Sequence, residues 1–253
     1  MSAPTRRHFH DELNDVKVRL LTMSGEAETA LRLATEALLE RDVEKARQVI
    51  ASDKVINDME VEIEETCIDL LALQQPMARD LRMLVAAIKI ANVLERVGDH
   101  AVNLAQSAER LTRGHPIAPE PEIVEMARLA RDMLADALES FVRGDAAAGR
   151  EVCLRDDRVD ALNRSVFRIL LTHMMEDPTS IGTGLELFLV SRNLERVADL
   201  ATNIAEDVVF LVEGKSIKHH AEDLTGGGPP DGSLLPGLAP LGHPRARRTP
   251  RRD

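Results

Sequence analysis

Aromatic residues are nearly missing from this 253-residue chain, which contains five Phe and neither Tyr nor Trp. Sheet proteins rely on aromatic and β-branched side chains, whereas Ala, Leu, Glu and Arg are good helix formers. A chain poor in the first group and rich in the second is typical of an all-α protein. Cysteine is scarce too, and Cys67 and Cys153 both lie within helical patterns. They predict small buried thiols rather than a disulfide framework.

Long apolar segments and secretion signals are also missing. The most apolar run, residues 84–94, contains Lys89 and ends at Glu95. It is therefore much shorter than the roughly 20 apolar residues of a membrane-spanning helix. Residues 1–11 contain no apolar segment of the kind found in a secretory signal. We expect a cytoplasmic protein, peripheral to the inner membrane if its partners are membrane proteins.

Basic residues are fewer than acidic ones, 32 against 43, which gives a formal net charge of −11. Residues 226–253 contain five Arg and two Asp, so this segment alone is positive and the rest of the chain is more acidic still. An acidic body repels nucleic acid and attracts cations or basic protein surfaces. We expect no nucleic-acid partner, and the Arg-rich end is interpreted as a solubilising tail.

An internal repeat determines the predicted architecture. The segment Asn92-Val-Leu-Glu-Arg-Val-Gly-Asp-His-Ala-Val-Asn103 matches Arg192-Asn-Leu-Glu-Arg-Val-Ala-Asp-Leu-Ala-Thr-Asn203 at an offset of one hundred residues. Further pairs keep the same order along the chain at similar offsets: Asp42 with Asp145, Asp53 with Asp156, and Gln75-Pro76 with Asp177-Pro178. A conserved order of this kind indicates that one unit was duplicated.

Each repeat contains residues that typically start helices, at positions that divide it into three helices. Asp42 and Asp145 are suited to cap new helices, and Pro76 and Pro178 suit the first helical position. The chain predicts two tandem three-helix bundles, in residues 5–113 and 122–218. A linker at 114–121 joins them, and a disordered Gly/Pro/Arg tail follows at 221–253. The expected helices span residues 8–40, 43–73, 77–112, 121–142, 146–174 and 179–213.

The third helix of each repeat contains a continuous apolar seam with alternating steps of four and three residues, which is typical of near-antiparallel helix packing. The two seams have the same register: Ile90, Leu94, Val97, Ala101, Leu104, Ala108 and Leu111 in the first repeat, and Val190, Leu194, Val197, Ala201, Ile204, Val208 and Leu211 in the second.

Four pairs of oxygen-bearing side chains follow the same duplication. Residues four apart share one helix face, so each pair presents two oxygens together. If the second and third helices of a repeat are neighbours, two pairs meet in one site. Carboxylate and amide oxygens suit hard or borderline cations. The pairs are Asp53/Asn57 with Glu95/Asp99, and Asp156/Asp160 with Glu195/Asp199.

A structural interpretation of the same residues stays open. The seam directs Glu95 and Asp99 outward, where charges are ordinarily solvated, and Arg96 and Arg196 could form surface ion pairs with Asp99 and Asp199. The pattern alone is compatible with a metal-dependent helical-bundle enzyme, such as an iron oxidase, and with a metal-free scaffold. Neither repeat has the Glu-x-x-His motif of ferritin-like proteins. His100 has Leu200 as its counterpart, so we interpret it as a lone surface histidine.

The paired motifs resemble the signature of the PhoU family. The similarity covers about residues 5–218 and includes Gln75-Pro-Met-Ala-Arg-Asp-Leu-Arg82 and Met175-Glu-Asp-Pro178 as well as the duplicated segments. The resemblance implies tandem three-helix bundles and a non-enzymatic, cytoplasmic negative regulator of phosphate uptake and phosphate-starvation signalling. It also implies contacts with the ATP-binding subunit of a phosphate ABC transporter and with a phosphate-sensing histidine kinase.

The resemblance further implies surface metal sites for iron, Zn, Mn or Mg. Matched residue by residue, Asp53, Asn57, Glu95 and Asp99 would form the first site. Asp156, Asp160, Glu195 and Asp199 would form the second. Asn57 replaces an acid of the motif, so the first site should be the weaker one. The sequence does not fix the oligomeric state, and a homodimer stays open.

Overall fold

The computed structural model describes residues 3–113 and 120–217, with side chains described from Phe9 onward. These residues form seven α-helices and one short 3₁₀ helix, and no strand occurs among them. The first bundle consists of α1 (Ala3–Glu40), α2 (Val43–Gln74) and α3 (Arg79–Leu111). The second consists of α4 (Pro121–Arg143), α5 (Ala146–Cys153), α6 (Asp156–Glu176), η1 (Pro178–Ser180) and α7 (Ile181–Glu213). The all-α prediction with two duplicated bundles is confirmed.

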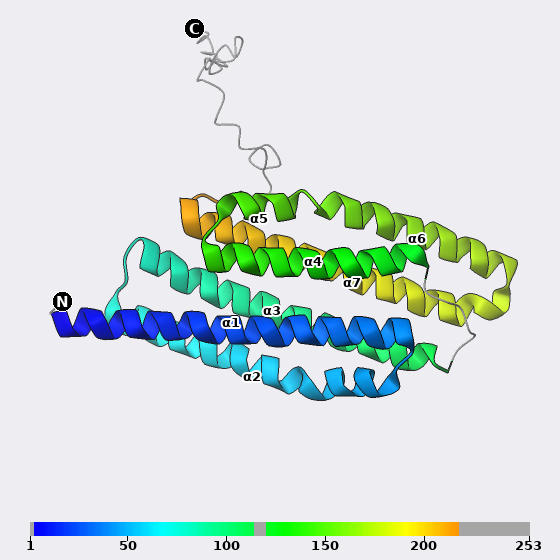
Figure 1. The fold of residues 1–253 in the computed structure, drawn as a ribbon, viewed down its shortest axis with the longest axis horizontal. Helices are drawn as coiled ribbons and strands as arrows, with labels where there is room; N and C mark the ends of the chain where they lie inside the picture. Colours follow the sequence, from blue (N-terminus) through cyan, green and yellow to red (C-terminus); the bar gives the residue numbers. More distant parts are fainter. Residues whose placement is uncertain (1–2, 114–119, 218–253) are drawn as a thin grey trace, which may run out of the picture.

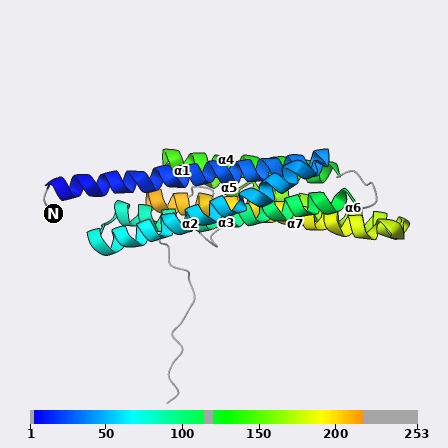
Figure 2. The same ribbon diagram turned by 90° about the horizontal axis from the view of Figure 1, so that it is seen from below.

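The two bundles lie side by side along their length (Figures 1 and 2). The third helix of each bundle is central, because α3 packs on α7 as well as on α1 and α2, and α7 packs on α4, α5 and α6. Every residue of the two predicted apolar seams is buried. The cysteines Cys67 and Cys153 are buried as predicted, and burial raises the pKa of both thiols.

Polar bonds cross the joint between the bundles. Lys89 Nζ donates to Asp207 Oδ1 over 3.0 Å, and Arg110 Nε donates to Glu186 Oε1 over 2.9 Å. The residue numbers of the partners rise on α3 as they fall on α7, so these two helices are antiparallel. His100 Nδ1 and Asn193 Oδ1 are hydrogen-bonded over 2.9 Å in the same joint. The prediction of a lone surface histidine was therefore wrong.

Two α-helices start at the predicted caps. The carboxylate of Asp42 accepts from the amides of Glu44 and Lys45, and that of Asp145 accepts from the amides of Ala147 and Ala148. Asp177 caps η1 rather than the following α-helix.

Two boundary predictions were wrong. Pro76 does not open a helix, because the chain turns through Gln75 and Ala78 with positive φ angles before α3 begins at Arg79. The expected helix 146–174 is interrupted at Leu154 and Arg155, which divide it into α5 and α6. Arg155 turns toward α4 there and donates to Asp136 over 2.6 Å.

Other sequence predictions fall partly or wholly on residues that are not described. These are positions 114–119 of the expected linker, the last residue of the expected second bundle, and the expected tail at 221–253. Within the described ranges, no helix combines the length and apolar character needed to cross a membrane.

Candidate metal centre

The first predicted group lies on the two neighbouring helices α2 and α3. Asp53 and Asn57 are one turn apart on α2, and Glu95 and Asp99 are one turn apart on α3. Ile56 and Gly98 lie between them on the facing surfaces, and a Cβ at Gly98 would be only 3.1 Å from Ile56 Cδ1. The missing side chain of Gly98 therefore lets the helix carrying Glu95 and Asp99 approach the other pair.

The electrostatic environment of Glu95 shows that these side chains converge. Partial burial raises the pKa of its carboxyl group, and the negative charges of Asp99, Glu60 and Asp53 raise it further. Asn57 Nδ2 donates to Asp53 Oδ2 over 3.1 Å. The other side-chain oxygens of these two residues, Asp53 Oδ1 and Asn57 Oδ1, are buried without a hydrogen-bond partner. Buried oxygens that lack a donor are suited to a cation.

Glu60 is a member of this group that the sequence analysis missed. It lies three residues beyond Asn57 on the same face of α2, and its charge acts on Glu95. The run Asp53, Asn57, Glu60 continues the helical spacing and was a usable signal. The second repeat does not reproduce it, because the counterpart is Asn163, whose Oδ1 accepts from Ser191 Oγ over 2.9 Å.

In the second predicted group, all four predicted residues are carboxylates. Asp156 and Asp160 lie on α6, and Glu195 and Asp199 lie on α7. Burial raises the pKa of Asp156 to about 6, and the charges of Asp199, Asp160, Asp157 and Glu195 also contribute. The four side chains predicted from spacing are therefore electrostatic neighbours across two helices.

Arginine side chains act as counter-ions in this second cluster. Arg196 Nη1 donates to Asp199 Oδ2 over 2.8 Å, which is the ion pair predicted for this repeat. Arg164 lies 3.5 Å from Asp160, and Arg192 lies 2.5 Å from Glu195 Oε2. These contacts partly neutralise the cluster, and a metal ion would have to compete with them.

Neither group is a closed metal cage as the side chains stand. Within residues 3–113 and 120–217, no three or more His, Cys, Asp or Glu side chains are placed around one point closely enough to hold an ion. The residues fit an open site of oxygen ligands that needs side-chain rotation to close. The seam predicted that Glu95 and Asp99 lie on the outward side of the bundle. Asp99 is exposed, whereas Glu95 is partly buried, and the side chain of Glu195 in the second repeat is only 14% exposed.

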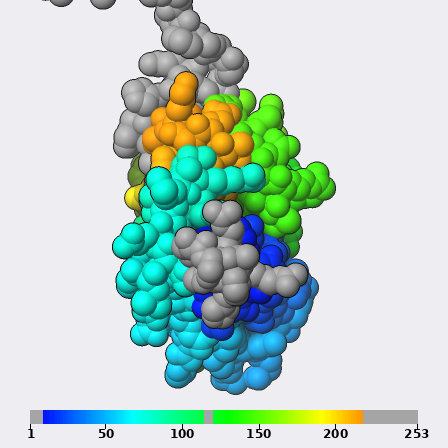
Figure 3. Space-filling model, turned by 90° about the vertical axis from the view of Figure 1, so that its left-hand side faces the viewer, coloured from blue at the N-terminus to red at the C-terminus, as the bar shows by residue number. Residues whose placement is uncertain are grey.

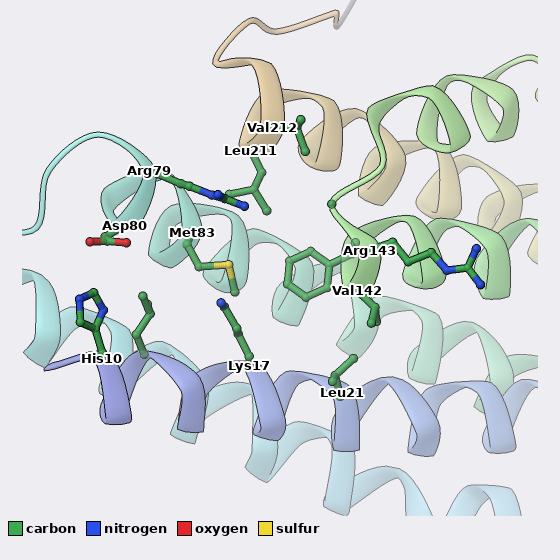
Figure 4. A pocket seen from close by; sticks show the side chains of 13 residues that line it. His10, Lys17, Leu21, Arg79, Asp80, Met83, Val142, Arg143, Leu211 and Val212 are labelled. Atoms are coloured by element: carbon green, nitrogen blue, oxygen red, sulfur yellow. The ribbon is translucent and has the colours of Figure 1, made fainter. Parts of the chain in front are cut away.

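A separate pocket of about 430 Å³ opens at one end of the molecule, between the two bundles (Figure 4). Figure 3 views this end, where the starts of α1 and α3 lie near the end of α7. The pocket contains Lys17 of α1 and Arg79 of α3, with an apolar wall that includes Met83 and Phe141. Its lining comes from both repeats, so its shape depends on how the bundles pack against each other.

The comparisons with known proteins agree with this architecture. A family model described as the PhoU domain matches residues 20–108 and 123–208, one match in each bundle. The phosphate-specific transport system accessory protein PhoU homolog of Zymomonas mobilis is 37% identical over 213 residues, which cover 84% of this chain and 90% of that protein. The corresponding homolog of Pseudomonas aeruginosa is 38% identical over 214 residues, covering 84% and 88%.

Solved structures show the same fold. The crystal structure of PhoU from Pseudomonas aeruginosa superposes with a TM-score of 0.80 at 38% identity, covering 82% of this chain and 100% of that chain. The phosphate transport system regulatory protein PhoU from Streptococcus pneumoniae gives a TM-score of 0.77 at 30% identity, covering 83% and 99%. With both domain matches and relatives aligned over most of their length, the chain belongs to the PhoU family.

Proposed function

We propose that this protein is a non-enzymatic accessory protein that negatively regulates phosphate uptake and phosphate-starvation signalling. One observation carries the proposal: relatives named as phosphate-specific transport system accessory proteins are 37–38% identical to it over about 84% of the chain. The family model matches both duplicated bundles, which supports a role shared with these relatives.

The proposed mechanism is differential binding. The acidic helical surface docks on the ATP-binding subunit of a phosphate transporter or on a phosphate-sensing kinase when phosphate is plentiful. It stabilises the inactive state of that partner, because a ligand shifts an equilibrium only by its difference in affinity for the two states. Partners of this kind place the protein in the cytoplasm at the inner membrane.

The proposal includes cation binding at both duplicated groups. Asp53, Asn57, Glu95 and Asp99 would hold one site, and their counterparts on α6 and α7 would hold the other. A bound cation would offset the repulsion between the carboxylates and strengthen the contact between the two helices that supply them. The first site should be weaker because it contains an amide in place of one carboxylate.

Gene deletion tests the regulatory role. A strain without the gene should express phosphate-starvation genes and take up phosphate in phosphate-rich medium, and a plasmid copy should restore repression. Unchanged uptake and unchanged expression in the deletion strain would contradict the proposal.

Elemental analysis tests the metal sites separately. The double variant Asp156→Ala/Glu195→Ala should retain less iron, Zn, Mn or Mg than the parent after equal loading. Asp53→Ala/Glu95→Ala should lose less, because its site is weaker in the parent. A matched control is Asp69→Ala/Glu151→Ala, which removes two exposed carboxylates outside both groups. Equal metal content in all four proteins would defeat this part of the proposal.

Turnover by metal-loaded protein that is lost in Glu195→Gln would instead favour an enzyme.

A further inference from the structure

A second pocket, of about 560 Å³, lies in the groove between α6 and α7. We name it the α6/α7 groove, and its lining residues are Ala161, Asn163, Arg164, Phe167, Arg168, Phe188 and Arg192. Its volume is within the range of small-molecule sites. The composition is unusual for this chain, because two of only five Phe residues and three Arg residues meet on the surface of a protein with a net charge of −11.

The side chains along this groove are ordered in layers. Helices α6 and α7 pack side by side and run in opposite directions (Figure 1). The rings of Phe167 and Phe188 form the apolar layer, with centroids 5.3 Å apart, and Phe167 is 47% exposed. One turn toward the start of α6, Arg164 and Arg192 form a cationic layer. A further turn brings Asp160 and Glu195, which pair with those two arginines.

The dimensions of this arrangement follow from helix geometry. Seven residues separate Phe167 from Asp160, and a rise of 1.5 Å per residue places the apolar and acidic layers about 10 Å apart. A ligand lying along the groove therefore meets two aromatic rings, tilted by 57° to each other, and then guanidinium groups. An extended ligand with one planar end and one anionic end matches this order, because its planar end would lie on the rings and its anionic end on the guanidinium groups.

The positive charge of the groove is available to a ligand. Arg168 has no ion-pair partner among the described residues, and Arg164 makes only a 3.5 Å contact with Asp160. Arg192 forms an ion pair with Glu195, and a bound anion would take the place of that carboxylate as the partner of Arg192. Three guanidinium groups from two helices thus surround one opening, and guanidinium groups bind phosphate with two parallel hydrogen bonds.

The groove is not a remnant of the duplicated bundle. At the corresponding positions of the first repeat, Arg164, Phe167 and Arg168 are replaced by Val61, Glu64 and Glu65. Phe188 and Arg192 are replaced by Ile88 and Asn92. The first repeat folds with other residues at these sites, two of them glutamates, so packing of the bundle does not require the arginines or the Phe167 ring.

We propose that the α6/α7 groove binds a nucleotide, with the base against Phe167 and Phe188 and the phosphates on Arg164, Arg168 and Arg192. A base stacks on an aromatic face irrespective of its identity, and phosphate oxygens take the guanidinium donors. An inorganic anion would use the arginines and leave the aromatic layer unused. The proposal does not rest on phosphate regulation. The groove adjoins the second candidate metal site, because Arg164 and Arg192 pair with Asp160 and Glu195, so its test is carried out without metal.

The test is equilibrium binding to the full chain in excess chelator, with ADP, adenosine and pyrophosphate as probes. ADP should bind more tightly than either of the other two. Arg168→Gln should weaken ADP and pyrophosphate by about tenfold, since one charge-assisted hydrogen-bonded contact is lost. Phe167→Leu keeps an apolar side chain but loses the flat ring, so it should weaken ADP severalfold and leave pyrophosphate unchanged. Lys54→Gln, which removes one exposed cation from α2, is the matched control and should bind as the parent does.

Several results would overturn the proposal. One is no saturable binding of ADP to the parent protein, and another is equal ADP binding by the parent and both groove variants. Pyrophosphate binding as tightly as ADP, with no effect of Phe167→Leu, would reduce the groove to an anion site. A polyglutamate peptide that displaces ADP at equal concentration would identify it as a docking surface for an acidic protein segment instead. Melting curves of the variants verify that each one is folded.

Discussion

Asp156 shows how strongly one residue can be affected by its place in the duplicated cluster. It begins α6, where the helix dipole favours a negative charge. Burial and four neighbouring carboxylates outweigh this effect and raise its pKa to about 6. At neutral pH the ionised carboxylate is therefore held in an unfavourable environment in the metal-free protein.

Asp156→Asn should consequently stabilise the metal-free protein at neutral pH. The folded-state pKa is raised above the unfolded value of 3.8, so the folded state binds the proton more tightly and stability falls as pH rises from about 4 to about 6. Because the side chain is only half buried, solvent screening reduces the expected gain at pH above 7 to about 1 kcal/mol. Thermal unfolding in chelator measures it.

The gain should disappear below about pH 4, where the parent is protonated in both states. Asp69→Asn, at an exposed position on α2, is the control and should change the melting temperature little at either pH. A lower melting temperature of Asp156→Asn at neutral pH would show that the carboxylate makes favourable contacts which outweigh the repulsion.

Residue spacing predicted which site side chains meet but not how deep they lie. Asp53 and Asn57 share a face because of the helical period, and this could be predicted from the sequence. The orphaned oxygens of these two residues, and the effect of the Glu60 charge on Glu95, depend on how closely α3 approaches α2. That distance is set by the fit of Gly98 against Ile56, which involves two helices and is not encoded in the period of either one.

At the scale of the helices, the ends with side-chain caps were predictable and the ends set by tertiary contacts were not. Asp42 and Asp145 cap α2 and α5 by local bonds within three residues, so their role follows from local sequence. Leu154 and Arg155 contain no Gly or Pro signal. The break there goes with the Arg155–Asp136 bond to α4 and with the close approach of Gly149 to α7.

The start of α3 contains backbone strain that a substitution should relieve. Ala78 has φ 50° and ψ −111°, a conformation that disfavours any residue with a Cβ. Ala78→Gly should stabilise the protein by about 0.5–1 kcal/mol, the relieved strain minus the added flexibility of the unfolded chain. Chemical denaturation with an unchanged m-value measures this gain.

A control for this prediction lies a few residues earlier in the chain. Ala72 is exposed inside α2 with ordinary helical geometry, and Ala72→Gly should destabilise by about 1 kcal/mol. If Ala78→Gly also destabilises the protein, the methyl group of Ala78 stabilises the turn before α3 and does not strain it.

At the scale of the whole molecule, one of the polar bonds across the joint between the bundles has a buried acceptor. The side chain of Asp207 is 4% exposed and accepts from Lys89, which is 45% exposed and also lies 5.3 Å from the ring centre of Phe210. Asp207→Asn should destabilise the protein by about 2 kcal/mol, because it weakens a buried charge-assisted bond. Asp15→Asn, which breaks an exposed pair with Arg19, should cost less than about 0.5 kcal/mol. Equal melting temperatures of the two variants would contradict this ranking.

The same Lys89–Asp207 bond has no equivalent on the other side of the pseudo-symmetric joint. The positions that correspond to Asp207 and Lys89 in the opposite repeats are Ser107 and Leu189. A self-pair of the second half would therefore set Asp207 against Leu189 and lose the bond that Lys89 donates. Two separately synthesised halves should assemble as a one-to-one complex of the first and second halves rather than as homodimers of either half. Co-purification of differently tagged fragments can establish this. Asp207→Leu should weaken that preference. Duplication supplied two bundles of the same fold, and this asymmetric bond should make each half prefer the other half to a second copy of itself.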